Sequence, residues 1–265
     1  MRVGESVRLG ESIMATTTAA VPQTPQPIGA FSRVIGALFN PRPTFEDIGR
    51  KPSWVVPMLI LIVLNIGITT VFSQRVGWRA FMEQQIEKSR SAQQALQQLS
   101  PEQREQRLAL QAKVANVFGY VGGIVGVPVV LMIIGAIFMG IFNATSSAEL
   151  DLNTSMSVAA HAYMPFAIAA LLGLIILCIK PPDAIDLQSL IASNLGAFLG
   201  NSAPQWLKSL CTSLDIFTFW VLGLMAFGYS VVRPKKIKMG SALTWIVGIW
   251  IAFVLIKVGF AALTS

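Results

Sequence analysis

The run VFGYVGGIVGVPVVLMIIGAIFMGIF, residues 117–142, decides the fold class of this chain. It holds no Asp, Glu, Lys or Arg, and it exceeds the roughly 20 apolar residues that a helix needs to cross a bilayer. Backbone N–H and C=O groups in hydrocarbon must find partners within the segment, and a helix provides them. The run therefore predicts a membrane-spanning helix.

Further windows on both sides of this run have the same character. They extend over residues 54–73, 158–179, 214–232 and 243–263. Each is close to the length that a spanning helix needs. We predict an all-α, polytopic membrane protein with five transmembrane helices, together with interfacial and soluble helices.

The composition agrees with a membrane protein. Of the 265 residues, 54% are hydrophobic and 12% are charged, whereas soluble domains carry about 25% charged residues. These values exclude a disordered chain, a collagen, a coiled coil and nearly any soluble globular protein. The net charge of +7 does not indicate a nucleic-acid partner, because Lys and Arg in such a chain serve topology and headgroup contacts. The expected partner is the lipid bilayer.

The N-terminal region divides into a tail and a short amphipathic segment. Residues 1–27 are rich in Thr, Ala, Pro and Gln, which predicts a disordered tail before a membrane domain of residues 28–265. Residues 28–39 place their apolar side chains on one helical face, with Arg33 elsewhere, as in a helix that lies in the membrane interface. Pro41, Pro43 and Pro52 then predict short helical turns at most.

The loops differ in character. Residues 74–116 form a polar helical loop, in which Ser100, Pro101 and Gln103 make a capping box. We expect one soluble helix before Ser100 and a second from Pro101 into the following span. Within residues 180–213, the stretch 185–199 is apolar enough for a helix on the membrane surface.

The distribution of Lys and Arg among the loops indicates the orientation of the chain in the membrane only weakly. A cytoplasmic N-terminus places ten Lys and Arg residues inside and nine outside, whereas the positive-inside rule needs an asymmetry. The dense turn RPKKIK, residues 233–238, favours that orientation. We expect an inner-membrane protein with a cytoplasmic N-terminus.

No reactive constellation is visible. His161 is the one histidine, and no phosphate loop, nucleophile elbow or zinc-type cysteine pairing is present. We predict no enzymatic activity, no catalytic residues, no metal and no cofactor. His161 is interpreted as an interfacial side chain with a wet edge, or as a proton acceptor.

Asp215 and Lys257 are the charges within the last two windows. Both lie about 20 residues from the basic turn, so an antiparallel hairpin brings them to one depth. They form a candidate intramembrane charge pair. Alternatively, Asp215 caps its helix and Lys257 extends to the nearer surface.

Small and sulfur-containing residues suggest further contacts. Gly119, Gly122, Gly123 and Gly126 form two pairs spaced by four, which lets helix backbones approach closely, either within the chain or in a homo-oligomer. Pro128 predicts a kink in the same helix. Cys178 and Cys211 flank one loop and share a side of the membrane, either as a disulfide or as two unpaired thiols.

Two stretches resemble the Yip family (Ypt/Rab-interacting-protein domain) in its bacterial form. They are FNPRPTFEDIGRKPSWVVPMLIL, residues 39–61, and SLDIFTFWVLGLMAFGYSVV, residues 213–232. The resemblance covers residues 31–265, with 74–116 as an insertion. It implies five spans, a cytosolic N-terminus and no enzymatic activity. Eukaryotic members associate with Rab-type GTPases and with one another. The present sequence has no counterpart of their acidic-aromatic N-terminal segment, which argues against a GTPase partner.

We therefore expect a non-enzymatic scaffold or membrane-organising factor that contacts copies of itself or other membrane proteins. The alternative is a small-solute transporter or channel subunit. Against this alternative, the first three windows contain no ionisable Asp, Glu, Lys or Arg, and no internal repeat is evident.

Overall fold

The computed structural model describes residues 28–87, 90–185, 190–200 and 203–263. Within these ranges the chain is helical and holds no β-strand, apart from an isolated bridge between Asn194 and Asp215. The tail predicted for residues 1–27 lies outside the described residues. The all-α fold class is confirmed.

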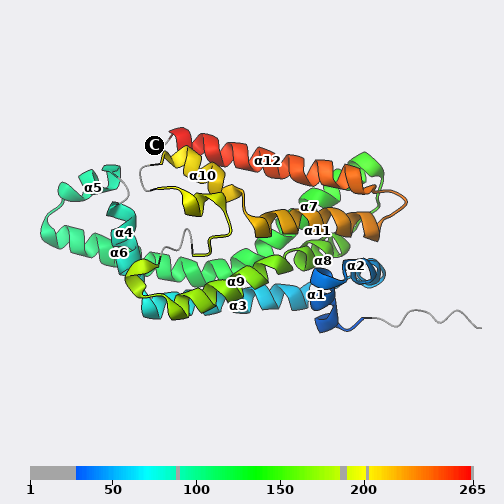
Figure 1. Ribbon diagram of the computed structural model, residues 1–265, viewed down its shortest axis with the longest axis horizontal. Coiled ribbons are helices and arrows are strands. Elements are labelled where there is room, and N and C mark those ends of the chain that lie inside the picture. Colours follow the sequence, from blue (N-terminus) through cyan, green and yellow to red (C-terminus); the bar gives the residue numbers. More distant parts are fainter. Residues whose placement is uncertain (1–27, 88–89, 186–189, 201–202, 264–265) are drawn as a thin grey trace, which may run out of the picture.

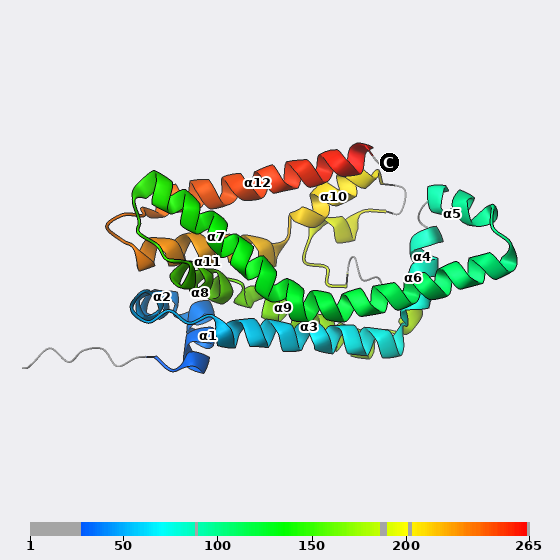
Figure 2. The same cartoon turned by 180° about the vertical axis from the view of Figure 1, so that it is seen from behind.

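Helical segments that run back and forth between two ends make up the bundle (Figures 1 and 2). In chain order they are α3 (Val55–Arg75), α6 (Pro101–Val121) continued by the π-helix η1 (Gly122–Gly126) and α7 (Val127–Ser146), α8 (Leu152–Ala162) continued by α9 (Met164–Ile179), α11 (Ile216–Val232), and α12 (Met239–Leu263). Helices α1 (Ala30–Phe39) and α2 (Pro41–Arg50) lie with the α11–α12 turn at one end, here called the N-terminal end. The long polar loop lies at the opposite, far end.

The lengths of these segments match a multi-pass membrane protein. In the described part of the chain, four segments are long and apolar enough to cross a membrane: residues 55–75, 101–146, 152–179 and 239–263. Helix α11 corresponds to the remaining predicted span. It has 17 residues and rises about 26 Å, slightly less than the roughly 30 Å hydrocarbon core.

The second pass is a continuous helix with one widened turn. The π-helix η1 directly precedes Pro128, which occupies an early position of α7. Proline has no N–H to donate, and its ring displaces the preceding carbonyl groups. A π-turn accommodates both effects without ending the helix. The structure places a π segment before Pro128, and the kink itself stays a prediction.

The third pass begins earlier than the sequence predicted. It starts at Leu152 rather than near Val158, and Asp151 caps it by accepting the backbone N–H of Thr154 at 2.8 Å. Burial opposes ionisation of Asp151, but its hydrogen bonds with Thr154 outweigh this effect and lower the pKa of the carboxyl group. Almost every residue of α8 is buried by protein, so only α9 in this pass has an exposed apolar face.

Serine and tyrosine hydroxyls satisfy one another inside the bundle. Ser155 Oγ donates to the carbonyl oxygen of Gly135 at 2.7 Å and lies 2.6 Å from Tyr229 Oη. Tyr229 is fully buried on α11, between Phe138 and Phe142 of α7. One hydrogen-bonded cluster therefore joins α7, α8 and α11.

In the polar loop, the predicted capping box and the helix from Pro101 are confirmed, but the single soluble helix predicted before Ser100 is wrong, because two separate helices occupy this segment. Helices α4 (Trp78–Glu87) and α5 (Arg90–Gln97) precede Ser100, whose capping box with Gln103 is present at the start of α6. Arg79 of α4 donates to Glu105 of α6 through Nη2 at 2.7 Å. Hydrogen bonding to Glu105 raises the pKa of Arg79 above its ordinary value.

The surface helix predicted over residues 185–199 is wrong for the described residues 190–200. They contain only the 3-10 turn η4 (Leu195–Phe198), which follows another 3-10 turn, η2 (Pro182–Ala184), and precedes α10 (Gln205–Ser213). A Cβ atom on Gly196 would lie 2.4 Å from Thr212 Cγ2. Close packing against α10, rather than apolar periodicity, thus sets the local backbone.

Replacement of Gly135 by alanine tests the α7–α8 contact. The added Cβ would lie 2.9 Å from Met156 Cγ and 3.1 Å from the backbone nitrogen of Met156. We expect Gly135→Ala to lower the free energy of unfolding by about 1–3 kcal/mol, because overpacking moves the backbone. Thermal unfolding in detergent measures the change.

Gly140→Ala on the same helix is the matched control. A Cβ atom there meets nothing within 4 Å. Because alanine favours helix over glycine by up to about 1 kcal/mol, this variant should be neutral or slightly stabilised. Equal destabilisation of the two variants would contradict the proposed close contact.

Candidate functional site

Two buried charges mark the site where the N-terminal helices meet the membrane bundle. Arg33 of α1 is 3% exposed and Asp47 of α2 is 2% exposed. Among the described residues no group of three or more His, Cys, Asp or Glu side chains is arranged to hold a metal ion. The Arg33–Asp47 pair is therefore the candidate functional site.

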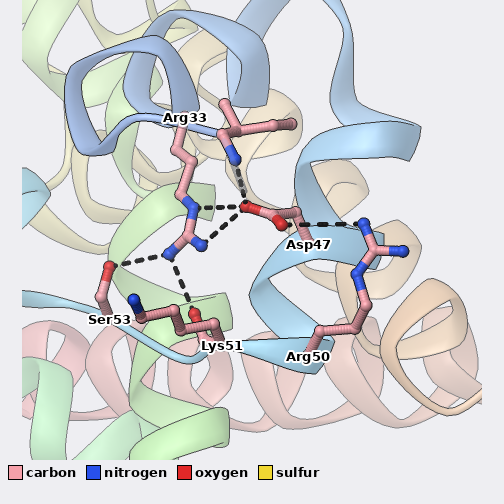
Figure 3. Close-up of polar contacts among 6 residues, drawn as sticks. Arg33, Asp47, Arg50, Lys51 and Ser53 are labelled. Carbon is pink, nitrogen blue, oxygen red and sulfur yellow. Dashed lines mark hydrogen bonds and ion pairs between the residues drawn. The ribbon is translucent and has the colours of Figure 1, made fainter. Parts of the chain in front are cut away.

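The guanidinium of Arg33 lies at the centre of a hydrogen-bond network (Figure 3). Its Nε donates to Asp47 Oδ2 at 2.7 Å, and its Nη2 lies 2.6 Å from the same oxygen. Its Nη1 donates to the carbonyl oxygen of Lys51 at 2.9 Å and to Ser53 Oγ at 3.1 Å. The backbone N–H of Ile28 also donates to Asp47 Oδ2, at 3.2 Å. The network joins α1, α2 and the segment that leads into α3.

Helix α2 forms despite its prolines, so the prediction of short turns at most is wrong. Pro41 is the first residue of α2 and Pro43 is the third. The first four N–H groups of a helix have no intrahelical acceptor, so proline sacrifices no hydrogen bond at these positions. The helix ends at Arg50, shortly before Pro52.

A tight contact brings the two charged residues together. Helices α1 and α2 meet at Asn40, whose carbonyl oxygen accepts the hydroxyl of Thr44 at 2.9 Å. A Cβ atom on Gly36 would lie 2.3 Å from Thr44 Oγ1. Any side chain at residue 36 would displace the Thr44 hydroxyl from its place, so glycine permits this close approach, which brings Arg33 against Asp47.

Two apolar side chains fix α2 to the bundle. Phe45 and Ile48 are fully buried in the main hydrophobic cluster together with Tyr229. A Cβ atom on Gly228 would lie 2.8 Å from the ring of Phe45. The inner face of α2 therefore carries both the core contacts and the carboxylate that holds α1.

The outer face of α1 is apolar and unprotected. Phe31, Ile35 and Phe39, spaced by four, are 66%, 52% and 74% exposed. Arg33 and Val34 point inward on the opposite side. The prediction of one apolar face is wrong, because Val34 is buried beside Arg33 whereas Phe31, Ile35 and Phe39 are exposed. Arg33 lies outside the exposed stripe, and Asp47 of another helix holds it in the interior. The interfacial position of α1 stays a prediction.

His161 lies deeper than the sequence suggested. It is fully buried on α8, and its Nδ1 lies 2.9 Å from the carbonyl oxygen of Ser157. Its Nε2 has no hydrogen-bond partner among the described residues. The interpretation of His161 as an interfacial side chain with a wet edge is wrong, since α1, α2, α7 and α11 enclose α8.

Comparison with protein families identifies the chain. The family model described as the Yip1 domain matches residues 35–261. This chain belongs to the Yip1 domain family. Neither the curated proteins nor the solved structures that were compared gave a match. The match includes α2 with Asp47, but it begins two residues after Arg33.

In this Yip1 domain, Asp215 and Lys257 do not form an ion pair among the described contacts. Asp215 Oδ1 accepts the backbone N–H groups of Phe217 at 2.9 Å and Thr218 at 3.0 Å, which caps α11. Lys257 Nζ donates to Ser213 Oγ at 3.1 Å. The carboxylate is held by the helix start, and the ammonium group has its own acceptor.

The predicted glycine contacts divide into two kinds. A Cβ atom on Gly119 would lie 2.9 Å from Trp78, and one on Gly123 would lie 2.3 Å from Asn65 Oδ1. Gly122 and Gly126 instead meet nothing within 4 Å. They line a groove of about 340 Å³ between α3, η1, α7 and α9. One pair thus packs within the chain, whereas the other faces open space.

The two cysteines are free thiols. Cys178 is exposed on α9, and Cys211 is half-buried on α10. The structure does not join them in a disulfide.

Sequence reasoning missed the Arg33–Asp47 pair, although one signal for it was present. Asp47 lies next to Ile48 and three residues after Thr44, at the edge of the helix face that Phe45 and Ile48 define, and all four residues are buried. A charge on such a face indicates a buried partner. The partner itself could not be read from the spacing, because it comes from another helix.

Removal of one charge should be worse than removal of both. We expect Asp47→Asn to lower the free energy of unfolding by about 3–5 kcal/mol, because the Arg33 charge stays buried without a counter-charge. Adding Arg33→Met removes that charge and should restore much of the loss. A double-mutant cycle by thermal unfolding in detergent measures the coupling.

Arg42 and Glu46 provide a matched control on the same helix. They form an i,i+4 pair at 3.3 Å, with side chains 78% and 48% exposed. Arg42→Gln should cost less than about 1 kcal/mol, because solvent screens this pair. Strictly additive effects of the Arg33 and Asp47 substitutions would show that the buried pair does not couple α1 to α2.

Proposed function

We propose that this Yip1 domain protein is a non-enzymatic membrane scaffold that organises the bilayer and neighbouring membrane proteins. The observation that carries the proposal is the apolar stripe of Phe31, Ile35 and Phe39, presented outward by a helix whose other face is locked in the protein. Such a stripe is favourable only against an apolar surface, and the acyl boundary of a leaflet supplies one.

The Arg33–Asp47 contact holds α1 in a fixed position, so α1 would insert into the leaflet permanently rather than reversibly. Arg33 and the buried Val34 bind α1 to α2 and to the bundle, while α2 is held by Phe45 and Ile48. A helix fixed at this level occupies area in one leaflet only. Many copies would therefore expand that leaflet relative to the other, which supports a role in membrane shape.

Three buried polar groups support a structural rather than a catalytic role. Arg33, Asp47 and Ser155 are all engaged in hydrogen bonds inside the protein. A catalytic group must reach substrate, whereas these groups hold helices together. Self-association is part of the proposal, because the open faces of Gly122 and Gly126 would let a second helix approach closely in lipid.

The shape of reconstituted vesicles tests the proposal. Purified protein in phosphatidylcholine liposomes should reduce vesicle diameter as the protein density rises, as measured by electron cryomicroscopy. The variant Phe31→Ser/Ile35→Ser/Phe39→Ser should lose the effect, because it removes the inserted stripe and leaves the Arg33–Asp47 network in place. Arg42→Gln, on the outer face of α2, should retain it.

A flux assay on the same liposomes tests the alternative of a transporter or channel subunit. A scaffold leaves solute permeability unchanged. Solute-specific flux that disappears on changing Asp215 would overturn the scaffold proposal, as would vesicle diameters that do not depend on the stripe.

We further propose that the N-terminal end faces the cytoplasm of a cell whose inner membrane holds the protein. Support comes from the dense group of exposed lysines in the short α11–α12 turn at that end. Lys and Arg in short loops favour the cytoplasmic side.

Reporter fusions test the orientation. A reporter inserted in the turn of residues 233–238 should be active in the cytoplasm, and one fused after Ser265 should be active in the periplasm. Because α12 lies between these two positions, a single crossing by α12 gives them opposite sides. The reverse pattern would invert the orientation, and a shared side would remove one of the passes.

A further inference from the structure

Two basic segments converge at the N-terminal end. Gly49 of α2 packs against Val232 at the end of α11, and a Cβ atom on Gly49 would lie 3.5 Å from Val232 Cα. Arg50 and Lys51 directly follow Gly49, and the turn of residues 233–238 directly follows Val232. The Gly49–Val232 contact therefore brings together two basic segments that are far apart in the sequence.

The α11–α12 turn presents its cations from a fixed backbone. Ile237 is 1% exposed and belongs to the main hydrophobic cluster, and its N–H donates to the carbonyl oxygen of Arg233 at 2.8 Å. Lys235, Lys236 and Lys238 on either side of it are exposed. The buried isoleucine thus holds the turn while three lysines face outward.

Arg233 is used to position the turn. Its Nε donates to the carbonyl oxygen of Ala148 at 3.2 Å, and its Nη2 donates to that of Glu149 at 3.4 Å. These bonds place the α7–α8 connection beside the turn. A surface pocket of about 340 Å³ results, lined by Glu149, Arg233, Lys235 and Lys236, among others.

Positive charge is in excess on this surface, here called the basic surface and defined by Arg50, Lys51, Lys235, Lys236 and Lys238. Within the described residues the four lysines have no ion-pair partner, and Arg50 lies 3.6 Å from Asp47 Oδ1. The nearby acids are Asp47, buried against Arg33, Glu46, paired with Arg42, and the exposed Glu149 and Asp151, of which Asp151 interacts with Arg233. The five cations of the surface outnumber these four acids, so the surface favours an anionic partner.

The stripe on α1 indicates which anionic partner fits. Helix α1 packs against α2 at the same end, and Phe31, Ile35 and Phe39 need an apolar environment. That requirement places α1 at the boundary of the acyl chains and the neighbouring basic surface at the level of the headgroups. A soluble acidic protein or an RNA would satisfy the cations but not the stripe.

We propose that the basic surface binds anionic phospholipid headgroups of the leaflet on the N-terminal side. Lys235 and Lys236, which line the pocket, contact the phosphate of a lipid, and Arg50, Lys51 and Lys238 attract its neighbours. The protein thereby gathers anionic lipids around one end. This binding does not depend on the proposed scaffold role, because a transporter with the same surface would bind the same lipids.

Lipid selectivity tests the proposal with the full chain in a bilayer. The protein is reconstituted in phosphatidylcholine or in an equimolar mixture of phosphatidylcholine and phosphatidylglycerol. The association of spin-labelled phosphatidylglycerol relative to phosphatidylcholine is measured by electron paramagnetic resonance. We expect a preference of about fivefold for each cation that contacts a headgroup, and the preference should fall as salt rises.

The variant Lys235→Gln/Lys236→Gln/Lys238→Gln should lose most of this preference. Arg104→Gln/Arg107→Gln/Lys113→Gln removes the same number of exposed charges from α6 at the far end and should retain it. Unchanged thermal unfolding in pure phosphatidylcholine shows that both variants are folded.

Equal lipid selectivity of the wild type and the turn variant would overturn the proposal, as would an equal loss in both variants. Tight binding of an acidic peptide or RNA with no lipid preference would assign the surface to another partner and would also overturn it. Vesicle shape depends on the α1 stripe and lipid selectivity on the lysines. Failure of one proposal is therefore distinguishable from failure of the other.

Discussion

The ion pair between Arg33 and Asp47 constrains the whole N-terminal end of the molecule. A buried guanidinium is tolerable only when a carboxylate and further acceptors surround it, and here α2 and the segment before α3 provide them. Since Arg33 must face inward, the apolar residues Phe31, Ile35 and Phe39 must face outward. The same contact that removes both charges from water thus leaves an apolar stripe exposed at the surface of the protein.

Hydrogen bonds of polar side chains also fix how the other helices of the bundle pack. Ser155 and Tyr229 satisfy each other between α8 and α11, and Asp215 satisfies two N–H groups at the start of α11. Arg75 donates to the carbonyl oxygen of Leu177 where α3 and α9 end together. In hydrocarbon no water can replace such partners, so each polar side chain fixes the depth or the rotation of its helix.

The N-terminal end carries both the apolar stripe on α1 and the exposed lysines of the α11–α12 turn. The stripe on α1 is exposed, and the turn held by Ile237 carries unpaired lysines at the same end. At the far end, Arg79 is joined to Glu105 across α4 and α6. An exposed apolar stripe beside exposed lysines is the combination on which the two proposals for this Yip1 domain rest.

The sequence by itself determined the elements whose signals are local. Apolar runs longer than a bilayer predict spans, a Ser-Pro-x-Gln pattern predicts the start of α6, and periodic apolar residues predict α1. Only the tertiary structure decided which polar residues are buried. Arg33 is held inside by Asp47 of the following helix. His161 is enclosed by helices that come before and after α8 in the sequence. Gly123, and not Gly122, packs against Asn65 of α3. Burial of a polar side chain depends on a partner from another segment, and the period of its own helix carries no information about that partner.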